Sequence, residues 1–230
     1  QIAAGLELSA FPQREDPRDA LVGRETGQTI EGLSRGARVG TGSTRRAAQL
    51  LALRPDLEIV PLRGNVPTRI EKMQTEDLEA VILACAGLDR LGLSDVISQR
   101  IAPEVMLPAV CQGMLALETR RGEDLSKEVS RLDSPENAVA ATAERSFLSQ
   151  LGGDCTIPLA AHCEKVGEDR IGVRACLASP DGTTLLRSEA QGSCASAAEI
   201  GKHLADEILS AGGRALLHDI RSEAGGNSRP

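Results

Sequence analysis

The sequence predicts an α/β domain built on a parallel or mixed sheet, followed by a smaller C-terminal α+β domain. Two observations predict this class. Between residues 36 and 93, short β-prone runs alternate with helical stripes of apolar residues, as in proteins with a parallel sheet. From residue 133 onward, one long amphipathic helix is followed by strands and a hairpin turn. The chain has 230 residues, of which 41% are hydrophobic, so it is long enough to bury a core.

The first part of the α/β pattern, residues 36–54, contains a strand, a glycine turn and a helix. An extended run over 37–41 leads into a turn with two glycines, and Ser43 is a suitable N-cap. Apolar residues then recur at helical spacing until Pro55. The same alternation continues, with strands expected at 57–62 and 80–84 and helices at 66–73 and 86–93. The second of these strands is continuously apolar, which is typical of a buried parallel strand.

The C-terminal domain is expected to begin with a helix over 137–151, which Gly152 and Gly153 end. Three strands and a closing helix follow, and the turn Pro180-Asp181-Gly182 predicts a hairpin. The strands are expected at 157–161, 171–177 and 184–188, and the closing helix at 197–211. The small polar tail, residues 222–230, is expected to be frayed.

Charge is unevenly distributed in this acidic chain, which has a net charge of -7 and a pI near 5.1. Residues 35–72 carry eight Lys or Arg and only three acids. DNA-binding domains are usually basic throughout, and only Phe11 and Phe147 are aromatic, so base stacking and a nucleic-acid partner are not expected. The basic segment predicts a site for a small anion, although a solvated arginine-rich helix face is the plainer alternative.

Four arginines lie where two of the expected strands end and helices begin. These are Arg45, Arg46, Arg63 and Arg69. The carboxyl ends of parallel strands meet at one edge of a sheet, where α/β proteins bind ligands. A helix N-terminus favours anions, and the planar guanidinium can grip a carboxylate with two hydrogen bonds. The pattern therefore favours a carboxylate-binding edge.

Several classes of protein and site are excluded by composition. No apolar run is long enough to cross a bilayer, and the first residues lack the basic and apolar regions of a secretory signal. The six cysteines form no CxxC pair and only three histidines are present, so neither a disulfide framework nor a metal site is expected. We therefore expect a cytoplasmic protein with reduced thiols and no membrane partner.

Six segments occur in order along the chain and together resemble one family. They are Arg14-Glu-Asp-Pro-Arg-Asp-Ala20, Val39-Gly-Thr-Gly-Ser-Thr-Arg-Arg46, Leu62-Arg-Gly-Asn-Val-Pro-Thr-Arg69, Leu83-Ala-Cys-Ala-Gly-Leu-Asp-Arg-Leu-Gly92, Leu107-Pro-Ala-Val-Cys-Gln-Gly113 and Gly152-Gly-Asp-Cys-Thr-Ile-Pro158. In this combination the chain resembles the porphobilinogen deaminases, or hydroxymethylbilane synthases, of tetrapyrrole (heme and chlorophyll) biosynthesis. The resemblance implies a periplasmic-binding-protein-like α/β domain. It also implies stepwise head-to-tail condensation of four porphobilinogen molecules, with release of ammonia, on a cysteine-linked dipyrromethane primer.

The resemblance also implies roles for individual residues. Cys155 corresponds to the cysteine that holds the dipyrromethane cofactor through a thioether. The other implied cofactor-binding residues are Thr41, Ser43, Arg45, Arg46 and Gln112, and the implied substrate-binding residues are Arg63, Asn65 and Arg69. Asp154 and Cys111 stand where glycine is usual in the family.

The residue types by themselves also allow purely structural interpretations of these cysteines and arginines. A free cysteine is usually a small buried hydrophobe, as we expect for Cys85 and Cys176, and Arg45 and Arg46 could be surface charge. Arg14 and Arg18 are expected to pair with the acids at positions 15, 16 and 19, in contacts of little energetic weight.

The resemblance divides the chain into three parts. Residues 1–21 and 107–128 correspond to a remnant of domain 1 with hinge segments, 22–106 to domain 2 and 129–230 to domain 3. The Ser-x-Lys-Asp motif that carries the family's general-acid Asp is absent, so the catalytic acid is unknown and the chain as given is expected to be inactive. The full-length protein is expected to be a monomer. The alternative is a non-catalytic, two-lobed anion- or solute-binding module.

Overall fold

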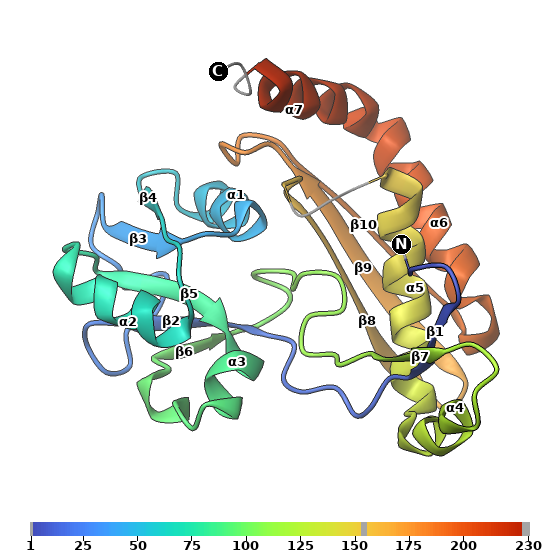
Figure 1. The fold of residues 1–230 in the computed structure, drawn as a ribbon. Coiled ribbons are helices and arrows are strands. Elements are labelled where there is room, and N and C mark those ends of the chain that lie inside the picture. Colours follow the sequence, from blue (N-terminus) through green and yellow to red (C-terminus); the bar gives the residue numbers. More distant parts are fainter. Residues whose placement is uncertain (1, 153–155, 227–230) are drawn as a thin grey trace.

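The computed structural model describes residues 2–152 and 156–226, which form two units joined by extended segments (Figure 1). The N-terminal unit contains a five-stranded sheet and three helices. The C-terminal unit contains a three-stranded sheet with long helices on one side. An α/β domain followed by a separate C-terminal domain of helices and an antiparallel sheet is thereby confirmed, although the C-terminal unit, from Pro135 to Gly226, is not the smaller of the two. In the described part of the chain, no helix is long and apolar enough to cross a membrane.

The sheet of the N-terminal unit is mixed. Its strand order is β4 (Glu58–Pro61), β3 (Arg38–Thr41), β5 (Ala80–Ala84), β2 (Asp19–Gly23) and β6 (Gln99–Ile101). β3 is parallel to both β4 and β5, whereas β2 is antiparallel to β5 and β6. The helices are α1 (Thr44–Leu53), α2 (Val66–Thr75) and α3 (Cys85–Arg90), with a short 3-10 turn η1 at Ser94–Val96. The alternation of strand and helix in the sequence predicted β3, β4 and β5 and the helices that follow them, but not the antiparallel part of the sheet, β2 and β6.

Both faces of this sheet are buried, which explains the uninterrupted apolar strands. Along β2, Leu21 faces one apolar core and Val22 faces the other. Along β5, Ile82 and Val81 divide between the same two cores. Each of these four side chains is at most 1% exposed. A strand covered on both sides has no solvent face for polar residues, so its sequence cannot alternate.

The C-terminal unit packs helices against one face of an antiparallel sheet. The strands, in spatial order, are β10 (Leu185–Ser193), β9 (Arg170–Ala178) and β8 (Leu159–Gly167). The helices are α5 (Pro135–Leu151), α6 (Ala197–Ile208) and α7 (Arg214–Gly226), with 3-10 turns η2 at Ser130–Leu132 and η3 at Cys194–Ser196. Phe147 of α5 and Leu204 of α6 are fully buried in the core against the sheet. The long helix expected over 137–151 is therefore present and covers the sheet together with α6.

The end of the chain differs from the sequence prediction. Residues 222–226, expected to be frayed, belong to α7, which follows a π-helical segment at Leu209–Gly213. Leu217 and Ile220 of α7 are buried in the core of the C-terminal unit and so hold the helix there. The sequence pattern obscured this helix because Gly212, with a φ of 111°, interrupts the helical run. Residues 227–230 lie outside the described residues.

A small two-stranded sheet lies beside the C-terminal unit. β1 (Leu6–Ala10) pairs antiparallel with β7 (Leu117–Arg120), and α4 (Asp124–Val129) packs against both. These strands come from the two segments that the sequence assigned to a remnant of domain 1. The boundary expected after residue 21 falls inside β2, so residues 19–21 lie in the five-stranded sheet. Otherwise the division into three parts stays a prediction.

Residues 11–18 and 102–116, the first and second hinge segments, link the small β1–β7 sheet to the five-stranded sheet. A fully buried carboxylate, Glu144 of α5, connects both hinge segments to the C-terminal unit. It accepts hydrogen bonds from Arg14 at 2.7 Å, from the Cys111 backbone N–H at 2.5 Å and from the Cys163 backbone N–H at 2.9 Å. The expectation that Arg14 pairs with neighbouring acids is therefore wrong, because its partner is 130 residues away. Arg18 does pair with Asp16, at 2.8 Å, as expected.

Replacing Glu144 should destabilise the fold strongly. In Glu144→Ala, the buried Arg14 and two backbone donors lose their acceptor, so we expect unfolding free energy to fall by about 3–5 kcal/mol in urea denaturation. Glu136→Ala, an exposed glutamate of the same helix, is the matched control and should cost less than about 1 kcal/mol. Equal losses in the two variants would contradict this assignment.

His162 makes stability depend on pH. Burial first, then the charges of Arg14 and Arg174, lower the pKa of His162 from 6.5 to about 4. As pH falls, the unfolded chain therefore binds this proton first, and stability is lost between about pH 6.5 and 4. Burial raises the pKa of the neighbouring Glu144, so its protonation stabilises the fold as pH falls. The contribution of His162 must therefore be isolated by comparing the wild type with a variant that lacks this histidine.

The free energy of unfolding of His162→Gln and of the wild type is measured in urea at pH 7.5 and at pH 5. Between pH 7.5 and pH 5, we expect the variant to become more stable relative to the wild type by about 2 kcal/mol. The subtraction removes the contribution of Glu144, which is present in both proteins. A difference between variant and wild type that is the same at both pH values would show that His162 titrates normally.

Candidate functional site

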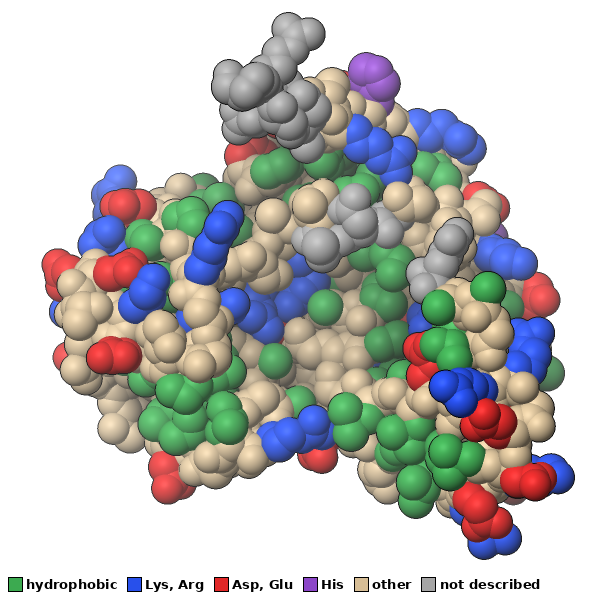
Figure 2. Space-filling model, viewed as in Figure 1, with side chains coloured by type: hydrophobic (Ala, Val, Ile, Leu, Met, Phe, Trp, Pro, Cys, Tyr) green, Lys and Arg blue, Asp and Glu red, His purple; other side chains and the backbone are tan. Residues whose placement is uncertain are grey.

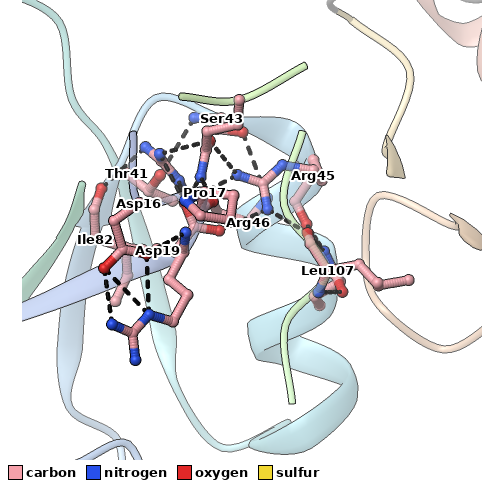
Figure 3. A network of polar contacts seen from close by, with 12 residues as sticks. Asp16, Pro17, Asp19, Thr41, Ser43, Arg45, Arg46, Ile82 and Leu107 are labelled. Atoms are coloured by element: carbon pink, nitrogen blue, oxygen red, sulfur yellow. Dashed lines mark hydrogen bonds and ion pairs between the residues drawn. The ribbon is translucent and has the colours of Figure 1, made fainter. Parts of the chain in front are cut away.

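Two arginines share one buried carboxylate where α1 begins. Asp19, at the start of β2, accepts hydrogen bonds from Arg45 Nη1 at 2.7 Å and from Arg46 Nε at 2.9 Å (Figure 3). Asp19 is fully buried, and the side chains of Arg45 and Arg46 are only 6% and 9% exposed. These arginines are therefore built into the fold and are not the surface charge that the sequence left as an alternative.

The turn between β3 and α1 places the two arginines. Ser43 caps the helix by accepting a hydrogen bond from the Arg46 backbone N–H, and Thr41 ends β3 as a buried residue. Between them, a Cβ on Gly42 would lie only 2.3 Å from the Leu62 carbonyl oxygen. Only glycine permits this close approach of the two loops. Thr41 and Ser43 thus lie beside the arginine pair, as the resemblance implied.

Gln112 closes this arrangement from the second hinge segment. Its Nε2 donates to Asp19 at 3.0 Å and to the Pro17 carbonyl at 2.7 Å, while its Oε1 accepts from Arg45 and Arg46, each at 3.4 Å. Cys111, beside it, has a φ of 58°, a conformation that favours glycine. The structure therefore brings Gln112 together with the pair that it was predicted to join.

The electrostatic balance of the cluster is positive. Burial opposes the charge on Asp19, but the two arginines overcome this effect and hold its pKa below the usual value. Burial first, and then the neighbouring Arg45, lower the pKa of Arg46. One carboxylate thus faces two guanidinium groups. Figure 2 shows basic side chains inside the hollow between the two units, in keeping with a site for anions.

The three residues predicted to bind substrate lie on the neighbouring turn between β4 and α2. Asn65 caps α2, because its Oδ1 accepts from the Thr68 backbone N–H at 3.0 Å. Arg69 donates from Nε to the Gly64 carbonyl at 2.8 Å, and its Nη1 lies 3.8 Å from the position of a Cβ on Gly42. Arg63 is exposed and has no ion-pair partner within the described residues. The two arginine-bearing turns are therefore adjacent.

Cys155 lies outside the described residues. Before it, α5 ends at Gly152 with a φ of 58°, and Arg221 donates to the carbonyls of Leu151 and Gly152. The other five cysteines are all free thiols. Burial raises the pKa of Cys85 and Cys176 to about 11, and that of Cys111 and Cys163 to about 12. Cys85, at the start of α3, and Cys176, in β9, are both buried as expected.

Several residues of the cluster were missed in the sequence. Asp19 was read as a partner for Arg14 or Arg18, and neither Gln49 nor the Leu107 carbonyl was singled out. The Leu107 carbonyl accepts from Arg45 Nη1 at 2.6 Å, and Gln49 makes two hydrogen bonds to the Leu107 backbone. No local pattern announces these contacts, because the two partners of each are 26 to 62 residues apart in the sequence. In the described residues, no group of His, Cys, Asp and Glu could hold a metal ion.

The chain matches two family descriptions. Residues 1–128 match "Porphobilinogen deaminase, dipyromethane cofactor binding domain", and residues 138–210 match "Porphobilinogen deaminase, C-terminal domain". The Syntrophus aciditrophicus porphobilinogen deaminase is 45% identical over 221 residues, covering 96% of this chain and 72% of that protein. The Roseiflexus castenholzii porphobilinogen deaminase is 45% identical over 213 residues, covering 92% of this chain and 69% of that protein.

The likeness to a solved structure is weaker, and no conclusion is drawn from it. An arginine-specific periplasmic binding protein of Salmonella typhimurium has a TM-score of 0.34 and 20% identity, covering 57% of this chain and 60% of that one. The sequence relatives are far closer, and they match both units of the fold. They favour the enzyme reading over the alternative of a non-catalytic binding module. The chain belongs to the porphobilinogen deaminase family.

Proposed function

We propose that the arginine pair at the start of α1 holds the carboxylates of a dipyrromethane cofactor attached to Cys155. The protein is a transferase of the hydroxymethylbilane synthase type, which joins four porphobilinogen units head to tail with release of ammonia. The cofactor, when bound, supplies the pyrrole terminus to which the first unit is joined. One observation supports this assignment of residues. Two buried arginines, Arg45 and Arg46, share the single carboxylate of Asp19, which leaves one positive charge unbalanced.

The residues present suit a polycarboxylate cofactor. Arg45 Nε is buried without a hydrogen-bond partner among the described residues, so the pair has an unused donor as well as an excess positive charge. Arg46 also lies in the first turn of α1, whose N-terminus favours anions. Asp19 and Gln112 hold both guanidinium groups in place before any ligand arrives. Such preorganisation lowers the entropic cost of binding.

Incoming porphobilinogen carries an acetate and a propionate, and the adjacent turn offers cations for them. Arg69 is fixed by the Gly64 carbonyl beside the β3–α1 turn, whereas Arg63 is exposed. We assign both to substrate carboxylates. Asn65 supports them indirectly, since its side chain caps the helix that carries Arg69. These side chains bind and orient the substrate, and the acid that moves the proton stays unassigned.

Cys155 is the thiol we assign to cofactor attachment. A thioether requires a nucleophilic sulfur, and thiolate character sets that reactivity. Four of the other thiols have a pKa raised to about 11 or 12, and that of Cys194 is also raised, so all five are poor nucleophiles near neutral pH. This elimination supports Cys155, which also stands in the family's motif.

We further propose that the full-length protein is a cytoplasmic monomer that acts on porphobilinogen and needs neither nucleic acid nor membrane. The free thiols of the described cysteines and the acidic net charge support this setting. The expectation that the chain as given lacks turnover stays a prediction.

Loss of Arg46 should weaken cofactor binding. Arg46→Ala removes a charge-assisted donor to the carboxylates, and we expect a smaller fraction of the purified protein to carry the cofactor, or the KM for porphobilinogen to rise about 10- to 100-fold. Arg46→Lys keeps the charge without the planar fork and should fall between. Arg24→Ala is the control, because Arg24 forms an exposed ion pair with Asp77. An Arg46→Ala protein that matches Arg24→Ala in steady-state kinetics and cofactor content would refute the assignment.

Cys155→Ser should abolish covalent attachment. Intact-mass measurement of the purified full-length protein should show the dipyrromethane increment in the wild type and in Cys194→Ser, and no increment in Cys155→Ser. The colour reaction with Ehrlich's reagent should follow the same pattern. Retention of the adduct in Cys155→Ser would place the attachment on another residue.

A further inference from the structure

The hairpin between β9 and β10 reaches from the C-terminal unit to α1 of the N-terminal unit (Figure 1). At its tip, a Cβ on Gly182 would lie 2.6 Å from the Ala48 carbonyl oxygen and 2.6 Å from the Ala52 backbone nitrogen. It would also lie 2.8 Å from Leu51 Cβ. Real Cβ atoms do not approach other atoms this closely. The hairpin tip is therefore seated directly on the backbone of the helix that carries Arg45 and Arg46.

The hairpin is stiff because its own polar groups close it. Ser179 Oγ bonds to Asp181 at 2.5 Å and accepts from the Thr184 backbone N–H at 2.9 Å. Asp181 also accepts from the Thr183 backbone N–H at 3.1 Å, and the Gly182 N–H donates to the Ser179 carbonyl at 3.0 Å. A turn braced in this way presents Gly182 to α1 at a fixed position.

The same sheet contacts the arginine pair by a second route. Leu107 packs with Ala160 of β8 and Cys176 of β9, and its carbonyl accepts from Arg45 Nη1 at 2.6 Å. Nearby, Arg174 forms an ion pair with Glu104, and Arg187 donates to the Glu104 carbonyl at 3.2 Å. The C-terminal unit thus holds α1 both at its first turn, through Leu107, and farther along, through Gly182.

We propose that Gly182 is a positioning residue, which sets where the Arg45–Arg46 pair lies relative to the C-terminal unit that carries Cys155. This inference rests on the proposed function, because it matters for the reaction only if cofactor attachment and carboxylate binding are divided between the two units. A ligand tethered to one unit and held by charges on the other depends on the distance between them. A misplacement of about 1 Å can lower a rate about 100-fold.

The test compares two glycines with the same backbone strain. Gly182 and Gly36 both have a φ of 73°, but a Cβ on Gly36 would meet nothing within 4 Å. Gly182→Ala and Gly36→Ala therefore share the cost of a left-handed alanine, and only the former adds an atom against α1. Amide hydrogen exchange of residues 48–53 in the full-length protein measures how firmly the helix is seated.

We expect exchange in α1 to be at least tenfold faster in Gly182→Ala than in Gly36→Ala, with kcat for porphobilinogen at least tenfold lower and KM less affected. Asp181→Ala gives a second test. It frees the turn without adding an atom beside α1, and should change exchange in the same direction by a smaller factor. Equal exchange and equal kcat in the two glycine variants would overturn the proposal. If no protein, wild type included, carries an adduct on Cys155, the proposed function fails, while the exchange comparison still decides whether Gly182 seats α1.

Discussion

The buried Asp19 carboxylate and its two arginines are the interaction on which the functional part of the molecule depends. Burying an isolated charge in that position would cost a large desolvation free energy. The ion pairs offset this cost only because other donors and acceptors of the cluster are also hydrogen-bonded. Gln112 and the Leu107 carbonyl provide some of these hydrogen bonds. As a result, one ion cluster joins the start of β2, the first turn of α1 and the second hinge segment. The excess positive charge that remains is what a polycarboxylate ligand can use.

Glu144 has the corresponding role at the C-terminal unit, and Arg14 links the two clusters. Arg14 donates to Glu144 at 2.7 Å and to the Gln112 carbonyl at 2.9 Å, and Gln112 in turn contacts Asp19. A continuous series of polar contacts therefore runs from α5 to the arginine pair. Because each contact uses a buried or half-buried group, solvent cannot replace a lost partner without cost.

The two units also meet through apolar and backbone contacts, so their relative placement does not depend on ion pairs alone. Leu107 enters a small core with Ala160 and Cys176, and Gly182 touches the backbone of α1. Gly182 meets α1 at Ala48 and Ala52, farther along the helix than the arginines that Asp19 holds. The helix that carries the candidate binding residues is therefore held at two places along its length by elements far apart in sequence.

The sequence by itself determined the local elements and the identity of the candidate ligand-binding side chains. Ser43 and Asn65 cap helices, and β5 is buried, because caps and apolar runs act over a few residues. The arginines of the two turns could likewise be named from strand-to-helix spacing and family motifs. The fold of the tail could not, since α7 follows a glycine that breaks the helical pattern and is held by long-range contacts, namely burial of Leu217 and Ile220 and the hydrogen bonds of Arg221 to the end of α5.

Only the tertiary structure decided what each charge does. Arg14 looked like a surface residue beside three acids, yet it pairs with a glutamate 130 positions away. Asp19, in the same acidic stretch, is the shared partner of Arg45 and Arg46. The physical reason is that the interaction energy and the pKa of a charged group depend on its burial and on the neighbours that folding brings close to it. The sequence determines which charged residues are present and where helices begin. Only folding determines which of these charged groups come together in the buried interior.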